Sequence, residues 1–205
     1  MAITTYTELK TAVVGFLDRT DLTARVPEFI ALAEAALNRE LRTNDQLAST
    51  TLPADSATLA LPQDLREVKA VRIASTGAPL KFRDIDQMDE QRPRFSTTGT
   101  PCFYGVAGLS LEFLPAVSGA APVDIFVRYF RAVPALTDSA TTNWLLTKHP
   151  DAYLYGALIH SAPYLREDDR VPLWVEAFTA ILESIRQESD RALFPAGVVT
   201  AEAYG

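Results

Sequence analysis

Cysteine and histidine are scarce in this sequence, which has only Cys102, His149 and His160. A single thiol excludes a disulfide within the chain, so nothing in the sequence requires an oxidising compartment. Two histidines without a cysteine pair, and without carboxylate–histidine spacing on a helix, make a zinc site a weak interpretation. We therefore expect His149 to mark a helix entrance and His160 to face solvent or a subunit contact.

Long apolar runs are also missing, and none approaches the roughly 20 residues that a membrane-spanning helix needs. No basic segment followed by an apolar one opens the sequence, so we expect no signal peptide and folding in the cytoplasm. With 205 residues, 48% of them hydrophobic, the chain can bury a core as one large or two small domains.

Basic residues are in the minority, since 19 lysines and arginines stand against 26 aspartates and glutamates. The formal net charge of -7 disfavours tight DNA binding, because neutralising phosphates requires a basic patch. An acidic or neutral channel that a duplex passes without adhering is compatible with this charge. Such a charge more often serves solubility alone.

Sequence motifs for enzyme chemistry are missing too, including the Gly-x-Ser-x-Gly elbow and the glycine-rich phosphate loops. Paired carboxylates could serve glycoside hydrolysis, but such pairs are ordinary in loops and at helix N-termini. Trp144 and Trp174 could stack on a sugar, and we expect them instead to anchor packing. The acidic pairs are Asp84 and Asp86, Asp89 and Glu90, and Asp168 and Asp169.

The N-terminal part of the chain predicts two amphipathic helices. Thr5 and Glu8 have the spacing of a capping box, which begins a helix that ends near Asp18. Pro27 suits the first turn of a second helix that continues to about residue 42. The expected apolar stripes are Tyr6, Leu9, Val13, Phe16 and Leu17, then Ile30, Ala33, Leu37 and Leu41, with Glu28, Glu34 and Arg42 on the wet face of the second helix.

Two further helices are predicted towards the C-terminus. Pro150 can open a helix that Pro163 ends or kinks. From about Asp168 to Arg191, apolar residues recur at steps of three and four, which is the clearest helical pattern in the chain. Asn143 can cap a short turn before these helices, and Gly156 allows another helix to approach closely.

Short β-type runs separated by Pro, Gly and Asp occupy the middle of the chain. Gly77 and Gly108 supply the positive φ of tight turns, so we expect antiparallel hairpins. The last run alternates between an apolar and a mixed face. We expect a brief helix over residues 84–90 and a loop over 92–100. The predicted strands are residues 58–61, 67–73, 79–82, 102–106, 109–114 and 123–131.

This order of elements predicts an α+β fold. We expect residues 1–45 and 143–192 to form a helical bundle and residues 46–142 an inserted antiparallel β lobe. Residues 193–205 carry no helical stripe and are expected to form an extended C-terminal arm.

Three segments share distinctive motifs with a known group of proteins. They are FIALAEAALNRELR at residues 29–42, TLALPQDLREVKAV at 58–71 and NWLLTKHPDAYLYGALIHSAPYLREDDRVPLW at 143–174. The Ala-Glu-rich helix, the Leu-Pro-x-Asp strand entry and the Trp-Leu-Leu, Pro-Asp-x-Tyr-Leu-Tyr-Gly and Ala-Pro-Tyr-Leu series resemble the head-to-tail adaptor, or head-tail connector, proteins of tailed bacteriophages. Together these segments follow the family order over most of the chain.

The resemblance implies a structural subunit of the virion neck with no catalytic residue, metal or cofactor and no contact with a membrane. It implies a homo-oligomeric ring, a dodecamer matched to the portal, with the helical bundle as the expected ring builder. The partners would be the portal protein and a downstream tail protein, and genomic DNA would pass without specific binding. A tail-associated cell-wall hydrolase and a monomeric binding module are the alternatives.

The expected arm is a hypothetical portal contact. Burying five side chains at about 2 kcal/mol each falls slightly short of the cost of ordering the arm at about 1 kcal/mol per residue. A ring presents many arms at once, so avidity can make the attachment firm. The five residues are Leu193, Phe194, Val198, Val199 and Tyr204.

Overall fold

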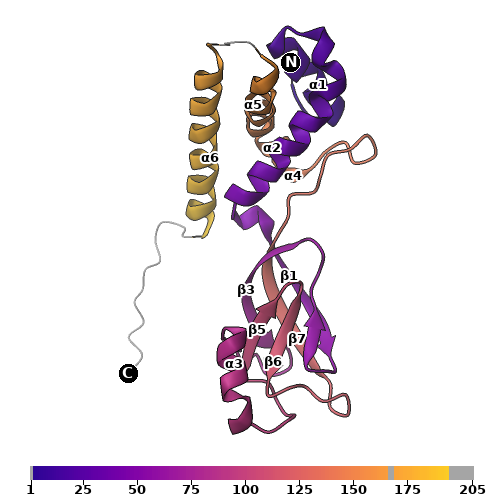
Figure 1. Ribbon diagram of the computed structural model, residues 1–205, viewed down its shortest axis with the longest axis vertical. Helices are drawn as coiled ribbons and strands as arrows, with labels where there is room; N and C mark the ends of the chain where they lie inside the picture. Colours follow the sequence, from indigo (N-terminus) through magenta and orange to yellow (C-terminus); the bar gives the residue numbers. More distant parts are fainter. Residues whose placement is uncertain (1, 166–168, 194–205) are drawn as a thin grey trace. The chain divides into compact units, whose positions relative to one another are not determined.

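The computed structural model describes residues 2–165 and 169–193 of the chain (Figure 1). Within these residues it contains six α-helices and seven β-strands, so the predicted α+β fold is confirmed. The chain folds as two compact units. The helical unit comprises residues 1–45 and 133 onward, and the β unit is Gln46–Ala132.

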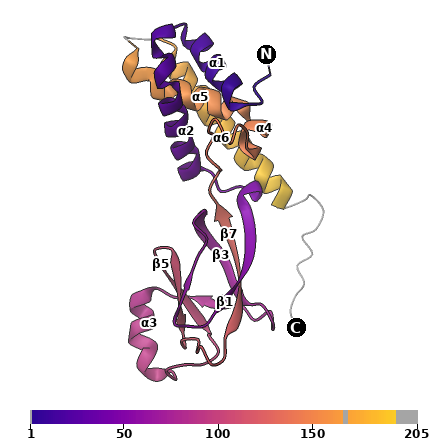
Figure 2. The same ribbon diagram turned by 90° about the vertical axis from the view of Figure 1, so that its right-hand side faces the viewer.

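The helical unit is arranged around one helix, α5, which contacts α1, α2, α4 and α6. Because neighbours surround it, α5 is apolar on nearly every side, and seven of its residues are buried. It lies between α2 and α6 (Figure 1, Figure 2). The helices are α1 (Tyr6–Leu17), α2 (Val26–Glu40), α4 (Trp144–Lys148), α5 (Pro150–Ser161) and α6 (Val171–Leu193).

Both ends of α1 follow the prediction. The Thr5 hydroxyl accepts from Glu8 N at 3.3 Å, and the Glu8 carboxylate accepts from Thr5 N at 2.9 Å. Additional bonds from the Thr4 hydroxyl and backbone lower the pKa of Glu8 to about 2. Asp18 then ends the helix in the left-handed region, at φ 53°.

Two side chains depart from the predicted faces. Phe16 is 49% exposed, because the bundle covers the Leu17 side of the last turn of α1. Glu34 was expected to contact water together with Glu28, and that prediction is wrong: only 8% of Glu34 is exposed, whereas Glu28 is exposed. Glu34 is buried because a distant chain segment crosses α2 and uses its carboxylate as a hydrogen-bond acceptor.

That crossing segment is residues 133–142, which were predicted to belong to the β lobe. In the structure it lies with the helices, since Val133 N donates to Asn38 Oδ1 at 2.8 Å and Leu136 N donates to Glu34 Oε1 at 2.7 Å. Val133 and Leu136 are both buried in the helical core. The organisation into a helical bundle, an inserted lobe and an arm stays a prediction. The C-terminal boundary of the lobe, predicted at residue 142, lies at Ala132.

The β unit contains two small sheets whose strand orders are β1-β7-β3 and β2-β6-β5-β4. Every strand pair is antiparallel except β4 with β5. Strand β1 was not among the predicted strands. The bounds are β1 (Leu47–Ala54), β2 (Thr58–Ala60), β3 (Leu65–Ile73), β4 (Lys81–Phe82), β5 (Phe103–Ala107), β6 (Ser110–Leu114) and β7 (Val123–Arg131).

One apolar core joins the inner faces of the two sheets. Ile125 and Val127 of β7 meet Leu111 and Phe113 of β6 there, and all four are fully buried. The turns at Gly77 and Gly108 have φ of 72° and 59°, as predicted. Helix α3 (Ile85–Gln91) packs beside β5 (Figure 2), and a short 3-10 helix (Arg92–Arg94) opens the predicted loop.

The close approach predicted at Gly156 is confirmed. A Cβ at this position would lie 3.0 Å from Ala33 Cβ of α2 and 3.2 Å from Phe178 Cε2 of α6. The missing side chain therefore sets how closely both helices pack on α5.

Alanine at Gly156 tests this packing. Alanine favours a helix by about 1 kcal/mol over glycine, but Ala33 can move only if α2 moves. We expect Gly156→Ala to lower the free energy of unfolding by about 1 kcal/mol net, measured by denaturant titration. Gly15→Ala in α1 is the matched control, because nothing lies within 4 Å of its added Cβ, and it should be stabilising. Equal unfolding midpoints for the two variants would contradict the close approach.

Candidate functional site

The described residues contain no group of three or more histidine, cysteine or acidic side chains that could hold a metal ion. His149 lies at the junction of α4 and α5, as predicted, with Nε2 3.8 Å from Glu188 Oε2. His160 is half-buried in α5, and burial together with nearby Arg39 lowers its pKa. Both histidines therefore belong to the packed helical scaffold.

The acidic pairs and the tryptophans likewise belong to the scaffold. Asp84 caps α3 by accepting from Asp86 N at 3.1 Å, and Asp89 accepts from Arg92 Nε at 2.8 Å. Trp174 is buried in the helical core, and Trp144 packs against that core. Asp168, the first member of the third pair, lies outside the described residues.

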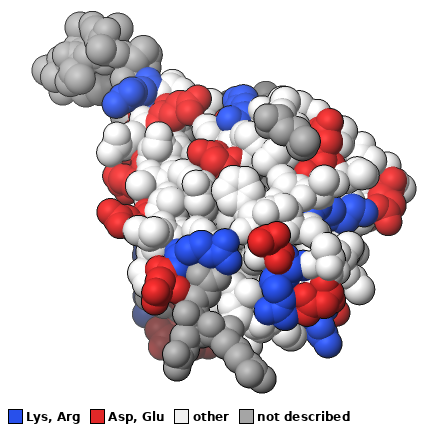
Figure 3. All heavy atoms as spheres, turned by 90° about the horizontal axis from the view of Figure 1, so that it is seen from above, with Lys and Arg blue, Asp and Glu red and all other residues white. Residues whose placement is uncertain are grey.

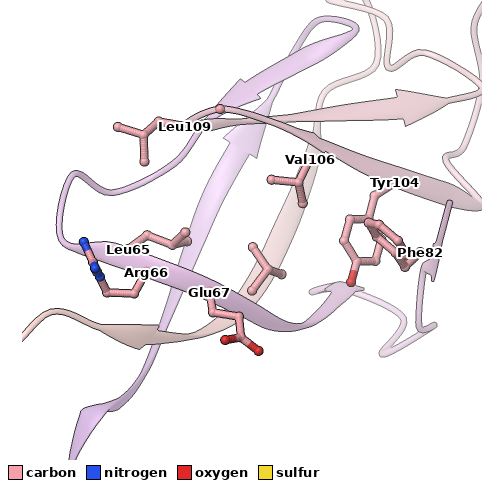
Figure 4. Close-up of a pocket in the computed structure, with 9 residues that line it drawn as sticks. Leu65, Arg66, Glu67, Phe82, Tyr104, Val106 and Leu109 are labelled. Atoms are coloured by element: carbon pink, nitrogen blue, oxygen red, sulfur yellow. The ribbon is translucent and has the colours of Figure 1, made fainter. Parts of the chain in front are cut away.

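A groove of about 560 Å³ crosses the β unit between β3 and the β5–β6 hairpin (Figure 4). Phe82, Val106 and Leu109 border it with exposed apolar surface. Glu67 is the only carboxylate among the nine lining residues, whereas glycoside hydrolysis uses two. The groove therefore lacks the pair of acids that the hydrolase alternative needs.

A buried polar network occupies the centre of the helical unit. Asn143 Nδ2 donates to Pro134 O and to the Tyr153 hydroxyl, both at 2.7 Å, while its Oδ1 caps α4 by accepting from Leu146 N at 2.8 Å. The Tyr153 hydroxyl donates in turn to Glu34 Oε1 at 3.4 Å. The network thus connects α2, α5 and the start of α4.

Burial dominates the electrostatics of this network. It raises the pKa of Glu34 above its ordinary value, and the hydrogen bonds from Leu136 N and Tyr153 offset only part of that shift. The pKa of Tyr153 is also raised, chiefly by burial, so its hydroxyl remains a donor at neutral pH. The arrangement holds helices together and contains no nucleophile paired with a base.

Charge is divided unevenly between the two units. The β unit has nine basic and nine acidic side chains, so the whole net charge of -7 belongs to the helical unit. On the face shown in Figure 3, basic and acidic side chains alternate rather than gather into one basic area. This face therefore has no basic area of the kind that binds a phosphate backbone.

The predicted portal contacts fall at and beyond the end of α6. Leu193 is the last residue of that helix. The other four residues lie outside the described part of the chain, so their contact with the portal stays a prediction. They are Phe194, Val198, Val199 and Tyr204.

A protein-family model described as SU10 adaptor protein matches residues 4–200 of the chain. The chain belongs to this adaptor family. The match spans both units and confirms the resemblance to phage head-tail adaptors. No curated protein matches the chain.

Membership of the SU10 adaptor protein family implies an adaptor role in a phage virion, non-enzymatic and based on binding other virion proteins. None of the described helices is long and apolar enough to cross a membrane. The buried network explains two of the recognised motifs, since Glu34 lies in the Ala-Glu-rich helix and Asn143 opens the Trp-Leu-Leu segment.

Substitutions at Glu34 test the network. Glu34→Ala leaves Leu136 N without its acceptor and should lower the free energy of unfolding by about 1–3 kcal/mol. Glu34→Gln keeps an acceptor oxygen without the charge, so it should match or exceed the wild type at pH 7. Glu28→Gln, on the exposed side of the same helix, is the control and should change stability by less than about 0.5 kcal/mol.

The pH dependence of the Glu34→Gln effect has a definite sign. Because the folded-state pKa of Glu34 is raised, ionisation costs the wild type stability as pH rises through the range between the ordinary and the raised pKa. The advantage of Glu34→Gln should be present above that range and lost below the ordinary pKa. Thermal melts of both proteins across pH measure it, and an advantage that grows towards low pH would contradict the assignment.

Proposed function

We propose that this chain is the structural subunit of a dodecameric ring that joins the phage portal to the tail at the virion neck. Its partners are the portal protein and a downstream tail protein. The family match over residues 4–200 carries the proposal. The ring continues the channel through which genomic DNA passes.

Features of the helical unit support assembly from identical copies. A closed ring requires each copy to present two different faces to its neighbours. Helix α6 packs mainly against α5 and leaves the rest of its surface exposed. Exposed Leu173 and Val175 lie near the start of this helix, where another protein chain can cover them.

The charge of the chain supports passage of DNA without adhesion. A net charge of -7 per copy repeats around a ring, and the resulting field repels a phosphate backbone. We propose that the surface lining the channel is acidic or neutral. A continuous ring of lysine and arginine at the narrowest point of an assembled complex would contradict this proposal.

Assembly can be measured directly. We expect the purified chain to form a homo-oligomer alone or on a portal template, seen by native mass spectrometry and sedimentation velocity. The portal alone provides the baseline. A chain that remains monomeric and never co-sediments with the portal would overturn the proposed function, and turnover of peptidoglycan by that monomer would favour the hydrolase alternative.

Truncation tests the proposed role of the C-terminal arm. Ending the chain after Leu193 keeps the full length of α6 and removes the other four hypothetical contact residues. We expect an unchanged thermal melt and weaker attachment to the portal in a pull-down. Phe194→Asp in the full-length chain should weaken attachment in the same direction. Full attachment by the truncated chain would show that docking uses the folded units.

A further inference from the structure

One face of the three-stranded sheet points away from the core of the β unit and carries aromatic rings beside cations. The Arg72 guanidinium of β3 lies 4.1 Å from the Phe126 ring centroid, and Arg128 lies 5.8 Å from the same centroid. Lys69 Nζ lies 5.2 Å from the centroid of the Phe130 ring. We call these five residues the basic sheet face.

The position of this face follows from the alternation along β7. Ile125 and Val127 point inward and are fully buried, whereas the alternate residues Phe126, Arg128 and Phe130 point outward and are more exposed. In the pairing register, Arg72 lies opposite Phe126 and Ala70 lies opposite Arg128, which brings the cations of β3 and β7 together. The face is thus a product of strand pairing.

None of the three cations has a carboxylate partner within 4.0 Å among the described residues. Arg92 of the same unit, by contrast, contacts both Asp89 and Glu112. The nearest acids along the sheet, Glu67 and Asp124, lie at opposite ends of the face, opposite Phe130 and Pro53. Its centre is therefore positive and aromatic, and it would be covered at least cost by a surface that supplies carboxylates.

Helix α6 carries the complementary pattern. Glu176, Glu183 and Asp190 are all exposed and recur every seven residues, so they form one row with a spacing of roughly 10.5 Å. Trp174 and Ile185, on the other side of the helix, are buried. We call the three acidic residues the acidic stripe of α6.

The acidic stripe has little to neutralise it in the described chain. Glu183 accepts a hydrogen bond from Gln187 Nε2 at 3.2 Å, and neither Glu176 nor Asp190 forms an ion pair with a described cation. Leu173, 63% exposed, precedes Glu176 by one turn and extends the same row with apolar surface. The row is thus acidic along most of its length and apolar at its start.

We propose that the basic sheet face of one copy docks on the acidic stripe of α6 of the next copy in the ring. This inference rests on the proposed ring, because a heterologous interface needs two different and complementary faces on every copy. Opposite charges meet in this pairing, whereas two sheet faces or two stripes would repel each other. Each copy therefore offers its sheet face to one neighbour and its helix to the other, so all copies are oriented in the same sense around the ring.

The dimensions of the two faces agree. Phe126 and Phe130 are four residues apart on one strand, which is roughly 13 Å. Successive acids on the helix are roughly 10.5 Å apart, and the long lysine and arginine side chains span the difference. Phe126 and Phe130 are only half-buried in the single chain and would be covered by the helix together with Leu173.

Charge reversal provides the test. The sheet variant carries Arg72→Glu and Arg128→Glu, and the helix variant carries Glu176→Lys and Glu183→Lys. Each variant alone should raise the protein concentration needed for half-assembly by more than about tenfold, because like charges then face each other. A mixture of the two should restore assembly, since each reversed face meets its reversed partner and the unchanged faces still match.

Restoration by mixing separates a contact between copies from one inside a single chain. Arg94→Glu, an exposed cation elsewhere in the β unit, is the control and should assemble like the wild type. Thermal melts verify that every variant folds. Native mass spectrometry of the mixture should show oligomers that contain both variants.

The outcomes distinguish this inference from the proposed function. If the wild type forms a ring and both variants do so equally well, or if the mixture fails to recover, the docking faces lie elsewhere and the ring stands. Binding of a DNA duplex at physiological salt that is lost in the sheet variant would overturn the inference and assign the face to nucleic acid. A wild type that never assembles, with or without the portal, overturns the ring itself and the inference with it.

Discussion

The helical unit depends on satisfying one buried carboxylate. Glu34 can remain inside only because Leu136 N and the Tyr153 hydroxyl donate to it. These bonds fix where the chain returning from the β unit crosses α2, and Asn143 then turns the chain into α4. The network therefore connects α2, α4 and α5 through polar contacts inside a mostly apolar core.

Local patterns predicted most of the helices and strands, because the capping box, helical periodicity and strand alternation depend only on residues within or next to each element. Strand β1 was missed, since it is rich in Ser and Thr and contains Pro53, and its pairing partner β7 lies far along the sequence. The burial of Glu34 was missed for the same reason: its donor, Leu136 N, is 102 residues away. Contacts of long sequence separation leave no periodic signal near either residue.

The candidate surfaces were predictable only in part. Alternation identified a mixed outer face on β7, but Arg72 joins Arg128 around Phe126 only through the register of a neighbouring strand. The net charge of -7 can be counted in the sequence. That this charge belongs entirely to the helical unit becomes clear only when the boundaries of the two units are known. In the proposed docking, recognition depends on how strands and helices distribute charged side chains over the surface.

The β unit begins and ends at the same place. Leu47, at the start of β1, is directly paired with Phe130, near the end of β7. A module whose two ends meet across one strand pair can be lengthened, shortened or replaced without separating the ends of the surrounding helices. The helical unit is thus joined to the β unit at two points of the chain that lie side by side, so a change in the size of the β unit need not disturb the helices.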